Sequence, residues 1–247
     1  MIIEQTIDKL YQMKLFGMAA SMKERLSRPD HRDLAVSDIL GLIVDDESIY
    51  RDNKRRQLRE TGAKFKDKQA TIESIDYSER RGFTKSQMLE LAQLHWVGKK
   101  QNLAITGPTG AGKSWIAQAL GHQACREGLR VLFLRQPMLI HAMLTAKASG
   151  GLPGLLKRLA KINILIIDDL GVSLMTDEVR RDLLEVIEDR YGVGSTIITS
   201  QLAVDEWHDY LAGGRIADAI CDRFTRNAHR IEVTGPSLRP EIDDQLD

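Results

Sequence analysis

The chain of 247 residues is 43% hydrophobic and 28% charged, which is enough apolar material for one domain of ordinary size and a smaller one. Its 35 basic and 35 acidic residues cancel, and no run reaches the ~18–20 apolar residues of a membrane helix, so neither general adhesion to nucleic acid nor a membrane partner is expected. The first residues lack the basic segment of a signal peptide, and the two distant cysteines, Cys125 and Cys221, show no metal-type spacing, which indicates reduced thiols in a cytoplasmic protein.

The first 60 residues carry helical patterns. Apolar residues recur there at steps of three and four: Ile3, Ile7, Leu10, Leu15 and Met18. This spacing predicts one amphipathic stripe, and Ser37 is a typical cap for a second helix. Between Arg51 and Lys68, eight basic residues accompany three acidic ones, and Thr61-Gly62 is expected to break the helix within this stretch.

Strands and helices alternate from residue 101 onward. Before them, residues 69–85 are polar and irregular, as in a linker, and a short helix is expected at 86–97. The expected strands are 102–106, 130–134, 162–167, 195–199 and 230–233, and the helices are 113–126, 137–147, 152–161, 177–191 and pieces of 204–226. This alternation predicts an α/β fold with a five-stranded parallel sheet covered by helices on both faces. The predicted domains are a helical domain at 1–68, a linker and lead-in helix at 69–98, and an α/β domain at 99–247.

The segment between the first strand and its helix fits the pattern G-x-x-x-x-G-K-[ST] at every fixed position. Its residues are Gly107, Pro108, Thr109, Gly110, Ala111, Gly112, Lys113 and Ser114. The backbone N–H groups of such a loop wrap phosphate, which needs glycines where a Cβ would obstruct the ligand, and the helix that follows favours an anion. Lys113 supplies a positive charge to the β- and γ-phosphates and Ser114 a hydroxyl ligand for magnesium. The pattern predicts binding of ATP with Mg²⁺, and we expect that the ATP is hydrolysed.

Two later strands carry polar side chains at their carboxyl ends, where ligands of open α/β sheets bind. The third strand ends in Asp168 and Asp169. We expect Asp168 to face the magnesium ion and Asp169 to orient or polarise the attacking water. The fourth strand ends in Ser200 and Gln201, which could sense the γ-phosphate or hold the water. In each case the alternative is an ordinary polar strand end that enters solvent.

Arg223, late in the second domain, is a candidate for an arginine that stabilises the transition state. It lies on a predicted helix, where it could reach the nucleotide of a neighbouring subunit. The alternative is a surface arginine paired with Asp222 or Glu232. Several other arginines could serve in its place: Arg215, Arg226, Arg230 and Arg239.

The basic stretch that follows the second predicted helix could contact DNA phosphates. Its candidate contacts are Arg51, Lys54, Arg55, Arg56 and Arg59. Because the net charge of the whole chain is zero, such a contact would be local. The alternative is a solvated helix face, which runs of charge usually form.

Four of these features, in the same order, resemble the IstB ATP-binding proteins, the AAA+ helpers encoded beside the transposase in one class of bacterial insertion sequences. They are the phosphate loop and the segments Ile166–Gly171, Ile197–Leu202 and Ala217–Phe224. Segments 227–233 and, less closely, 235–239 are also similar. The N-terminal segments Leu10–Ala20 and Leu40–Arg59 resemble this family more than its relatives, the helicase loaders of the DnaC type and the initiator DnaA. The resemblance covers nearly the whole chain.

The resemblance implies an AAA+ P-loop ATPase core without a C-terminal helical lid, preceded by a small all-helical domain. It implies a homo-oligomer that assembles with ATP on duplex DNA and presents this target to the transposase. Arg223 would act in trans as an arginine finger and Gln201 as a sensor residue, while Pro236 departs from the acidic residue that the family usually carries. Two other functions stay open: a DnaC-type helicase loader, which should not need a basic duplex-binding stretch, and a small NTP-dependent kinase, for which no substrate-lid signature is visible.

Overall fold

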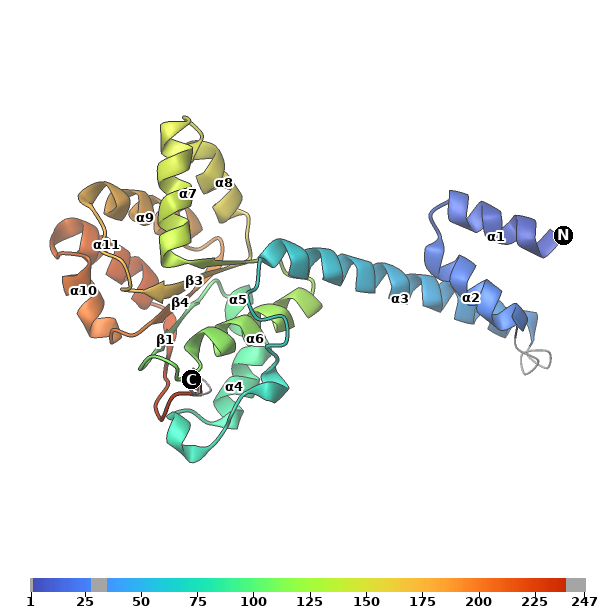
Figure 1. The fold of residues 1–247 in the computed structure, drawn as a ribbon, viewed down its shortest axis with the longest axis horizontal. Helices are drawn as coiled ribbons and strands as arrows, with labels where there is room; N and C mark the ends of the chain where they lie inside the picture. Colours follow the sequence, from blue (N-terminus) through green and yellow to red (C-terminus); the bar gives the residue numbers. More distant parts are fainter. Residues whose placement is uncertain (1, 28–34, 239–247) are drawn as a thin grey trace, which may run out of the picture. The chain divides into compact units, whose positions relative to one another are not determined.

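The computed structural model describes residues 2–27 and 35–238 and divides the chain into two compact units (Figure 1). The first unit comprises residues 1–58 and the second residues 59–247. The division falls within one helix, α3, which extends from Val36 to Ala63, and the domain boundary at residue 68 stays a prediction. No helix within the described ranges is long and apolar enough to cross a bilayer.

The first unit is built from helices. They are α1 (Ile2–Gln12), α2 (Phe16–Ser27) and the first part of α3. The single stripe expected here is interrupted, because residues 13–15 form a turn with Lys14 in the left-handed region at φ 61°. Beyond the turn, a Cβ added to Gly17 would lie only 2.7 Å from the carbonyl oxygen of Asp46 on α3. Only glycine permits this approach, so Gly17 allows α2 to pack directly on α3.

Helix α3 continues past the point at which the sequence predicted a break. The prediction of a break at Thr61-Gly62 is wrong, since both residues are helical and α3 ends at Ala63. An exposed glycine inside a helix costs only about 1 kcal/mol. The last turn is held by the complete burial of Ala63 and by a 2.9 Å hydrogen bond from Arg59 Nε to the carbonyl oxygen of Cys125. Both contacts are internal to the second unit, to which the last turn of α3 belongs.

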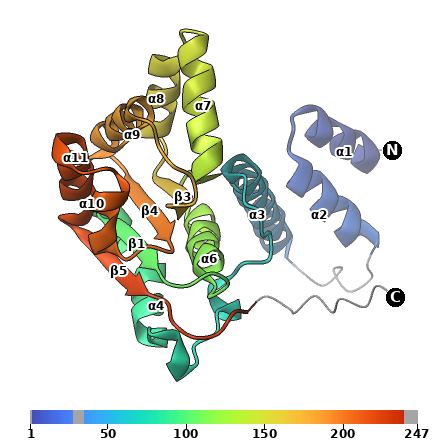
Figure 2. The same ribbon diagram turned by 60° about the vertical axis from the view of Figure 1, so that its left-hand side comes forward.

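The second unit alternates strands with helices, as the sequence predicts (Figure 2). The strands are β1 (Asn102–Thr106), β2 (Val131–Arg135), β3 (Ile164–Leu170), β4 (Ser195–Ser200) and β5 (Ala228–Glu232). The helices are α4 (Lys85–Ala92), α5 (His95–Gly98), α6 (Lys113–Arg126), α7 (Gln136–Ala148), α8 (Leu152–Ala160), α9 (Asp177–Arg190), α10 (Trp207–Tyr210) and α11 (Gly214–Thr225). The single lead-in helix expected at 86–97 is divided into α4 and α5, and β3 extends further than expected, to Leu170.

The five strands form one sheet in the order β2-β3-β4-β1-β5, and all neighbouring strands are parallel. Because successive side chains of a strand point to opposite faces, Ile164 and Ile166 join one apolar core while Leu165 and Ile167 join the other. Helices α4 to α6 cover the first face and helices α7 to α11 the second. The expected five-stranded parallel sheet with helices on both faces is confirmed.

Parallel pairing places the carboxyl ends of the strands along one edge of the sheet. At this edge Thr106 of β1 lies in register with Ser200 of β4, and Arg135 of β2 with Asp168 of β3. The loop after β1 and the polar ends of β2, β3 and β4 therefore meet there. Along the described chain beyond β5, up to residue 238, no helix follows.

Candidate nucleotide-binding site

The phosphate loop lies where β1 ends and α6 begins. Its glycines Gly107, Gly110 and Gly112 have φ values of 140°, 80° and 97°, a region that side chains with a Cβ rarely adopt. At Gly107 a Cβ would also lie 2.0 Å from the carbonyl oxygen of Val233. The loop therefore needs the glycines of the motif, and it opens directly into the N-terminus of α6, whose dipole favours an anion.

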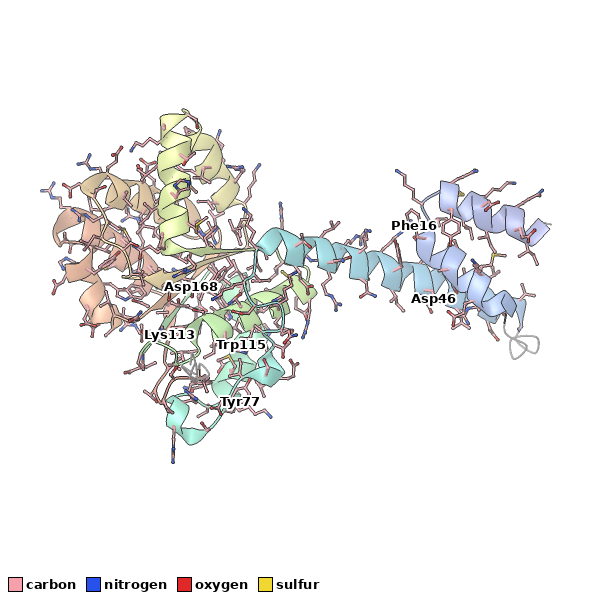
Figure 3. The ribbon with its side chains drawn as sticks, viewed as in Figure 1. Phe16, Asp46, Tyr77, Lys113, Trp115 and Asp168 are labelled. Carbon is pink, nitrogen blue, oxygen red and sulfur yellow. The ribbon has the colours of Figure 1, made fainter. Side chains whose placement is uncertain are left out.

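Lys113 and Ser114, the first residues of α6, face the loop and the end of β3. The Lys113 side chain is buried, and its Nζ donates a 2.8 Å hydrogen bond to the carbonyl oxygen of Pro108. The Ser114 hydroxyl lies close enough to the carboxylate of Asp168 to lower the pKa of that carboxyl by hydrogen bonding. Figure 3 labels Lys113 and Asp168 within the second unit. The fold thus brings together three residues that the sequence assigned to one site.

Asp168 is the buried carboxylate of this site. It is only 3% exposed, and the Thr199 hydroxyl donates a 2.6 Å hydrogen bond to its Oδ1. Burial raises the pKa of Asp168, and the hydrogen bonds from Thr199 and Ser114 oppose that rise. A carboxylate next to a hydroxyl suits Mg²⁺, which binds oxygen and usually takes one or two carboxylates together with substrate phosphates. Thr199 was not singled out from the sequence, where its only signal is a hydroxyl near the end of an apolar strand.

A β-bulge at the end of β3 contains the two carboxylates, Asp168 and Asp169. Ile167 pairs with Ile198, but the next aligned pair is Leu170 with Ser200, so β3 contains one extra residue. Within the bulge, Asp169 has a φ of 59°, a conformation that aspartate tolerates better than most residues. The bulge changes the direction of the chain between the two aspartates, so that only the first is deeply buried.

Asp169 is fixed from two sides. Its backbone N–H donates a 2.9 Å hydrogen bond to the Thr199 hydroxyl. Its Oδ2 lies 3.2 Å from a guanidinium nitrogen of Arg135, the last residue of β2. Arg135 was also missed in the sequence, where its only signal is a basic residue directly after the second expected strand. The ion pair holds the Asp169 carboxylate at the edge of the sheet that carries the phosphate loop.

Of the two polar residues at the end of β4, Ser200 is buried and Gln201 is exposed. The Ser200 hydroxyl donates to the carbonyl oxygen of Leu170 at 2.6 Å and accepts from the N–H of Leu202 at 3.1 Å. Its carbonyl oxygen accepts a 3.2 Å hydrogen bond from the N–H of Gly107. Ser200 therefore connects β4 to the phosphate loop. Gln201, the next residue, is exposed beside it.

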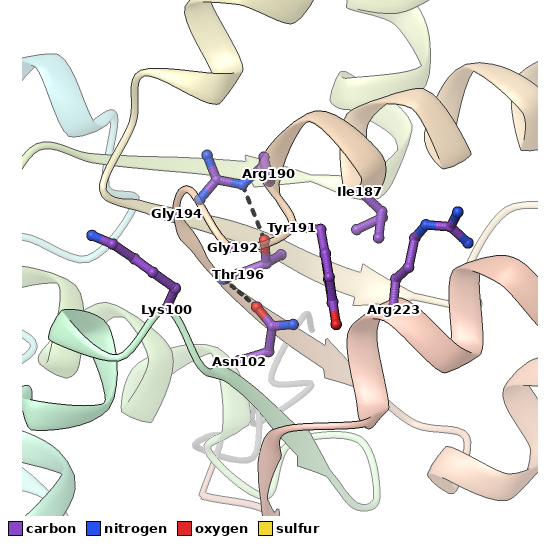
Figure 4. A pocket seen from close by; sticks show the side chains of 9 residues that line it. All are labelled: Lys100, Asn102, Ile187, Arg190, Tyr191, Gly192, Gly194, Thr196 and Arg223. Carbon is purple, nitrogen blue, oxygen red and sulfur yellow. Dashed lines mark hydrogen bonds between the residues drawn. The ribbon is translucent and has the colours of Figure 1, made fainter.

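Arg223 lies at the opposite edge of the sheet. A guanidinium nitrogen is 2.9 Å from Glu188 Oε1 on α9, so its acidic partner comes from another helix. Arg223 lines a small pocket with Asn102 and Thr196, which are at the starts of β1 and β4 (Figure 4). At about 3.3 Å per residue, β1 separates this pocket from the phosphate loop by about 13 Å. The structure does not bring Arg223 to the phosphate loop of its own chain.

The predicted DNA-binding residues belong to both units. Four of them are exposed on α3 in the first unit: Arg51, Lys54, Arg55 and Arg56. Arg51 pairs with Glu47 at 2.7 Å and Arg55 with Asp52 at 3.5 Å. Arg59 belongs to the second unit, where it holds the end of α3. Arg239, one of the arginines considered beside Arg223, lies outside the described residues.

Comparison with protein families finds one that is described as IstB-like ATP binding protein and matches residues 8–245. An insertion sequence ATP-binding protein of Sinorhizobium fredii is 41% identical, with 97% of each chain covered. The ATP-binding protein of insertion sequence IS1162 of Pseudomonas fluorescens is 43% identical, and the match covers 82% of this chain and 87% of the relative.

Solved structures show the same fold in the second unit. The crystal structure of the DnaC helicase loader has a TM-score of 0.56 and 20% identity, covering 67% of this chain and 97% of the loader chain. The replication initiator DnaA bound to AMPPCP and single-stranded DNA has a TM-score of 0.59 and 18% identity, covering 70% of this chain and 52% of DnaA. The second unit is thus an α/β AAA+ P-loop fold, preceded by helices α1 to α3.

Proposed function

The chain belongs to the family of IstB-like ATP-binding proteins, and we propose that it is an ATPase that assembles on duplex DNA and assists the transposase of an insertion sequence. The nucleotide part of this proposal rests on one observation. Lys113, Ser114 and Asp168 converge at the end of a glycine loop that leads into a helix N-terminus. The remainder rests on relatives that match nearly the whole chain and are named as insertion sequence ATP-binding proteins.

The proposed chemistry follows from the placement of these groups. The loop N–H groups and Lys113 would hold the β- and γ-phosphates of ATP and offset their charge. Ser114 and Asp168 would hold Mg²⁺, which neutralises charge that develops on the phosphates during transfer. Asp169 would orient the attacking water, with Arg135 fixing the direction of its carboxylate. Catalysis of this kind depends mainly on positioning and electrostatics.

The N-terminal unit and the edge that carries Arg223 support the oligomeric, DNA-bound part of the proposal. Four basic side chains are exposed on α3, where they could neutralise DNA phosphates. Arg223 is too far from its own phosphate loop to act there, which favours action on a neighbouring copy. A helicase-loader function is less favoured, because the likeness to DnaC covers 67% of this chain at 20% identity, whereas the insertion sequence relative covers 97% at 41%.

The nucleotide part can be tested by equilibrium binding and phosphate release with MgATP. Wild-type protein should bind MgATP and release phosphate. Lys113→Ala should weaken binding strongly, because one charge-assisted contact to the phosphates is lost. Lys157→Ala on α8 is a matched control, since Lys157 is an exposed lysine away from the loop. Equal binding by the two variants would remove Lys113 from the site.

The DNA part can be tested by duplex binding over a series of salt concentrations. The double variant Arg55→Ala/Arg56→Ala should bind duplex DNA more weakly, and its salt dependence should be shallower by about 0.9 in log–log slope for each lost phosphate contact. Lys157→Ala/Arg158→Ala removes two exposed positive charges from the second unit and serves as the control. Unchanged DNA binding by the α3 variant would remove this stretch from the interface and strengthen the helicase-loader alternative.

A further inference from the structure

A segment that follows β5, residues 233–238, lies against the phosphate loop. A Cβ added to Gly110 would lie 2.2 Å from the Ser237 hydroxyl oxygen, and one added to Gly112 would lie 3.3 Å from Leu238 Cδ1. The same segment begins beside Gly107, as described above. All three glycines of the motif therefore contact one short stretch of chain that the motif itself does not include.

One hydrogen bond from this segment sets the direction of a peptide in the loop. The N–H of Leu238 donates to the carbonyl oxygen of Gly110 at 2.9 Å. In a planar trans peptide the carbonyl and the following N–H point in opposite directions. The N–H of Ala111 is therefore directed away from the segment and toward Pro108, whose carbonyl oxygen accepts a 3.3 Å hydrogen bond from it. A phosphate loop offers its ligand the backbone N–H groups that point into the loop.

A buried arginine holds the segment in place. Arg81 is only 4% exposed, and a guanidinium nitrogen donates a 2.9 Å hydrogen bond to the carbonyl oxygen of Pro236. Its Nε is 2.8 Å from Asp76 Oδ2, which fixes the orientation of the guanidinium. The backbone contributes as well, because the N–H of Thr234 donates to the carbonyl oxygen of Arg81 at 3.0 Å. Residues 76–81, which precede α4, thus hold residues 233–238 in place.

We propose that Arg81 is a positioning residue of the nucleotide site: it fixes residues 233–238, whose Leu238 N–H orients the phosphate loop for its ligand. This inference rests on the proposed function, since it concerns the same loop. Arg81 touches neither the phosphates nor the reacting groups, and it acts through Pro236 and Leu238. A loop held in its binding conformation before the ligand arrives spends less free energy on ordering when the ligand binds.

The inference predicts a specific kinetic pattern. Disorder of the loop should weaken ATP and ADP alike, because both nucleotides place their β-phosphate in it. The turnover of bound ATP should change less, because Asp168 and Asp169 are held by β3, Thr199 and Arg135 instead. Loss of the Arg81 contacts should therefore raise KM for MgATP and the dissociation constant for MgADP together, with a smaller change in kcat.

The first experiment compares Arg81→Met with Arg80→Met in the full-length protein. Arg80 is the adjacent arginine and is exposed, so the two variants differ in the buried contact and not in charge. Arg81→Met should raise the dissociation constants for MgATP and MgADP about ten-fold, the loss expected for one hydrogen bond to a charged group. Arg80→Met should stay within two-fold of wild type, a range of about 0.4 kcal/mol. Arg81→Lys, which keeps a cationic donor, should recover part of the affinity.

The second experiment tests the hydrogen bond to the loop directly and remains decisive if Arg81→Met fails to fold. Leu238→Pro removes the backbone N–H that Gly110 accepts, whereas Leu238→Ala keeps it. The proline variant should bind both nucleotides more weakly than the alanine variant, with thermal unfolding of the ligand-free proteins measured alongside.

The outcomes separate this inference from the function beneath it. If wild-type protein binds MgATP but Arg81→Met matches Arg80→Met, or Leu238→Pro matches Leu238→Ala, the positioning role is overturned and the ATPase proposal stands. If wild-type protein binds no MgATP, the proposed function itself is overturned.

Discussion

Thr199 is the residue on which both carboxylates of the site depend. Its hydroxyl donates to Asp168 Oδ1 at 2.6 Å and accepts from the backbone N–H of Asp169 at 2.9 Å. One buried hydroxyl thus orients the side chain of the first aspartate and fixes the backbone of the second. Because the β-bulge places Asp169 at a positive φ, this hydrogen bond also holds a backbone conformation that few residues adopt.

Replacement of Thr199 by valine should therefore affect stability and activity together. Thr199→Val keeps the shape but leaves the Asp169 N–H without its acceptor, and a buried group left unpaired costs about 1–3 kcal/mol. Urea denaturation should show this loss, and the hydrolysis rate should fall at saturating MgATP because the carboxylates are no longer held. Thr199→Ser retains the hydroxyl and should stay close to wild type in both measurements. Equal behaviour of the two variants would contradict the role assigned to the hydroxyl.

Only some of the site residues could be predicted from the sequence. Lys113 and Asp168 could be predicted because each stands at a fixed offset in a pattern whose physical demands are specific. Arg135 and Thr199 could not, because their roles arise from neighbours in the sheet: β2 and β4 lie on either side of β3, and a single sequence does not state the strand order. The roles of Gln201 and of the basic residues on α3 stay predictions.

At the scale of elements, α2 is positioned by carboxylates of α3. Glu47 Oε2 accepts a 3.0 Å hydrogen bond from the N–H of Met18 in the first turn of α2. Asp46 accepts from the Ser21 hydroxyl and from Arg25 at 2.8 Å. Asp46 and Glu47 lie in the segment Leu40–Arg59 that resembles the IstB family, and they also have a structural role as partners of the N-terminus and side of α2.

The charge of Glu47 should make the first unit sensitive to acid. Burial alone would raise the pKa of Glu47, but hydrogen bonds from the Met18 N–H, the Arg51 side chain and the Gly17 N–H lower it overall. A carboxyl with a lowered pKa contributes stability above its ordinary value of about 4.3 and loses it as pH falls through the folded-state pKa. Glu47→Gln should therefore destabilise α2 near neutral pH by about 0.5–2 kcal/mol, the range of a lost cap.

Hydrogen exchange of the α2 amides can measure this effect without global unfolding. The difference between wild type and Glu47→Gln should be largest near neutral pH and should shrink as the solution is made acidic. Asp45→Asn is the control, since Asp45 is an exposed carboxylate two residues before Glu47. A difference that persists unchanged at low pH would show that the charge of Glu47 does not hold the helix.

The regular elements of the second unit were predictable within a few residues, and the interruptions were not. Buried strands such as β1 and the capped helix α9 carry strong local signals. The break between α4 and α5 occurs at Leu94, whose φ of 59° accompanies a 2.9 Å hydrogen bond from Trp96 Nε1 to the carbonyl oxygen of Leu91. Leu94 and Trp96 are buried in the core between the sheet and helices α4 to α6, and their burial favours that turn. Helical periodicity in the sequence does not reveal tertiary packing of this kind.

At the scale of the second unit, the two ends of the parallel strands form two edges of the sheet that carry different functional residues. The carboxyl edge carries the phosphate loop and both aspartates, and the amino edge carries Arg223. The amino edge is firmly built: Arg190 is 1% exposed and donates to the carbonyl oxygens of Leu159 and Ile162 and to the Thr196 hydroxyl. Burial lowers the pKa of Arg190 to about 10, so it keeps its charge at neutral pH. Arg223 lines a pocket with this buried arginine, pairs with Glu188, and lies at the edge opposite the phosphate loop.

In the proposed oligomer, two edges of this kind would complete one another between copies of the chain, in a head-to-tail arrangement. Arg223→Ala should lower the hydrolysis rate with little change in ATP affinity, because the arginine acts on charge that develops in the transition state. Asp169→Asn should also be slow, because the amide would no longer orient the attacking water as proposed for the carboxylate. In a mixture, an Arg223→Ala subunit retains an intact Asp169, and an Asp169→Asn neighbour can supply the missing arginine.

Mixing the two slow variants should therefore restore hydrolysis. With equal amounts and random assembly, about a quarter of the head-to-tail interfaces combine both intact groups. The control mixes Arg223→Ala with the double variant Asp169→Asn/Arg223→Ala, which creates no such interface and should stay slow. Phosphate release measured across mixing ratios should pass through a maximum near equal amounts. Because each variant alone lacks one half of the site, no activity maximum at any ratio would place Arg223 outside the reaction of the neighbouring subunit.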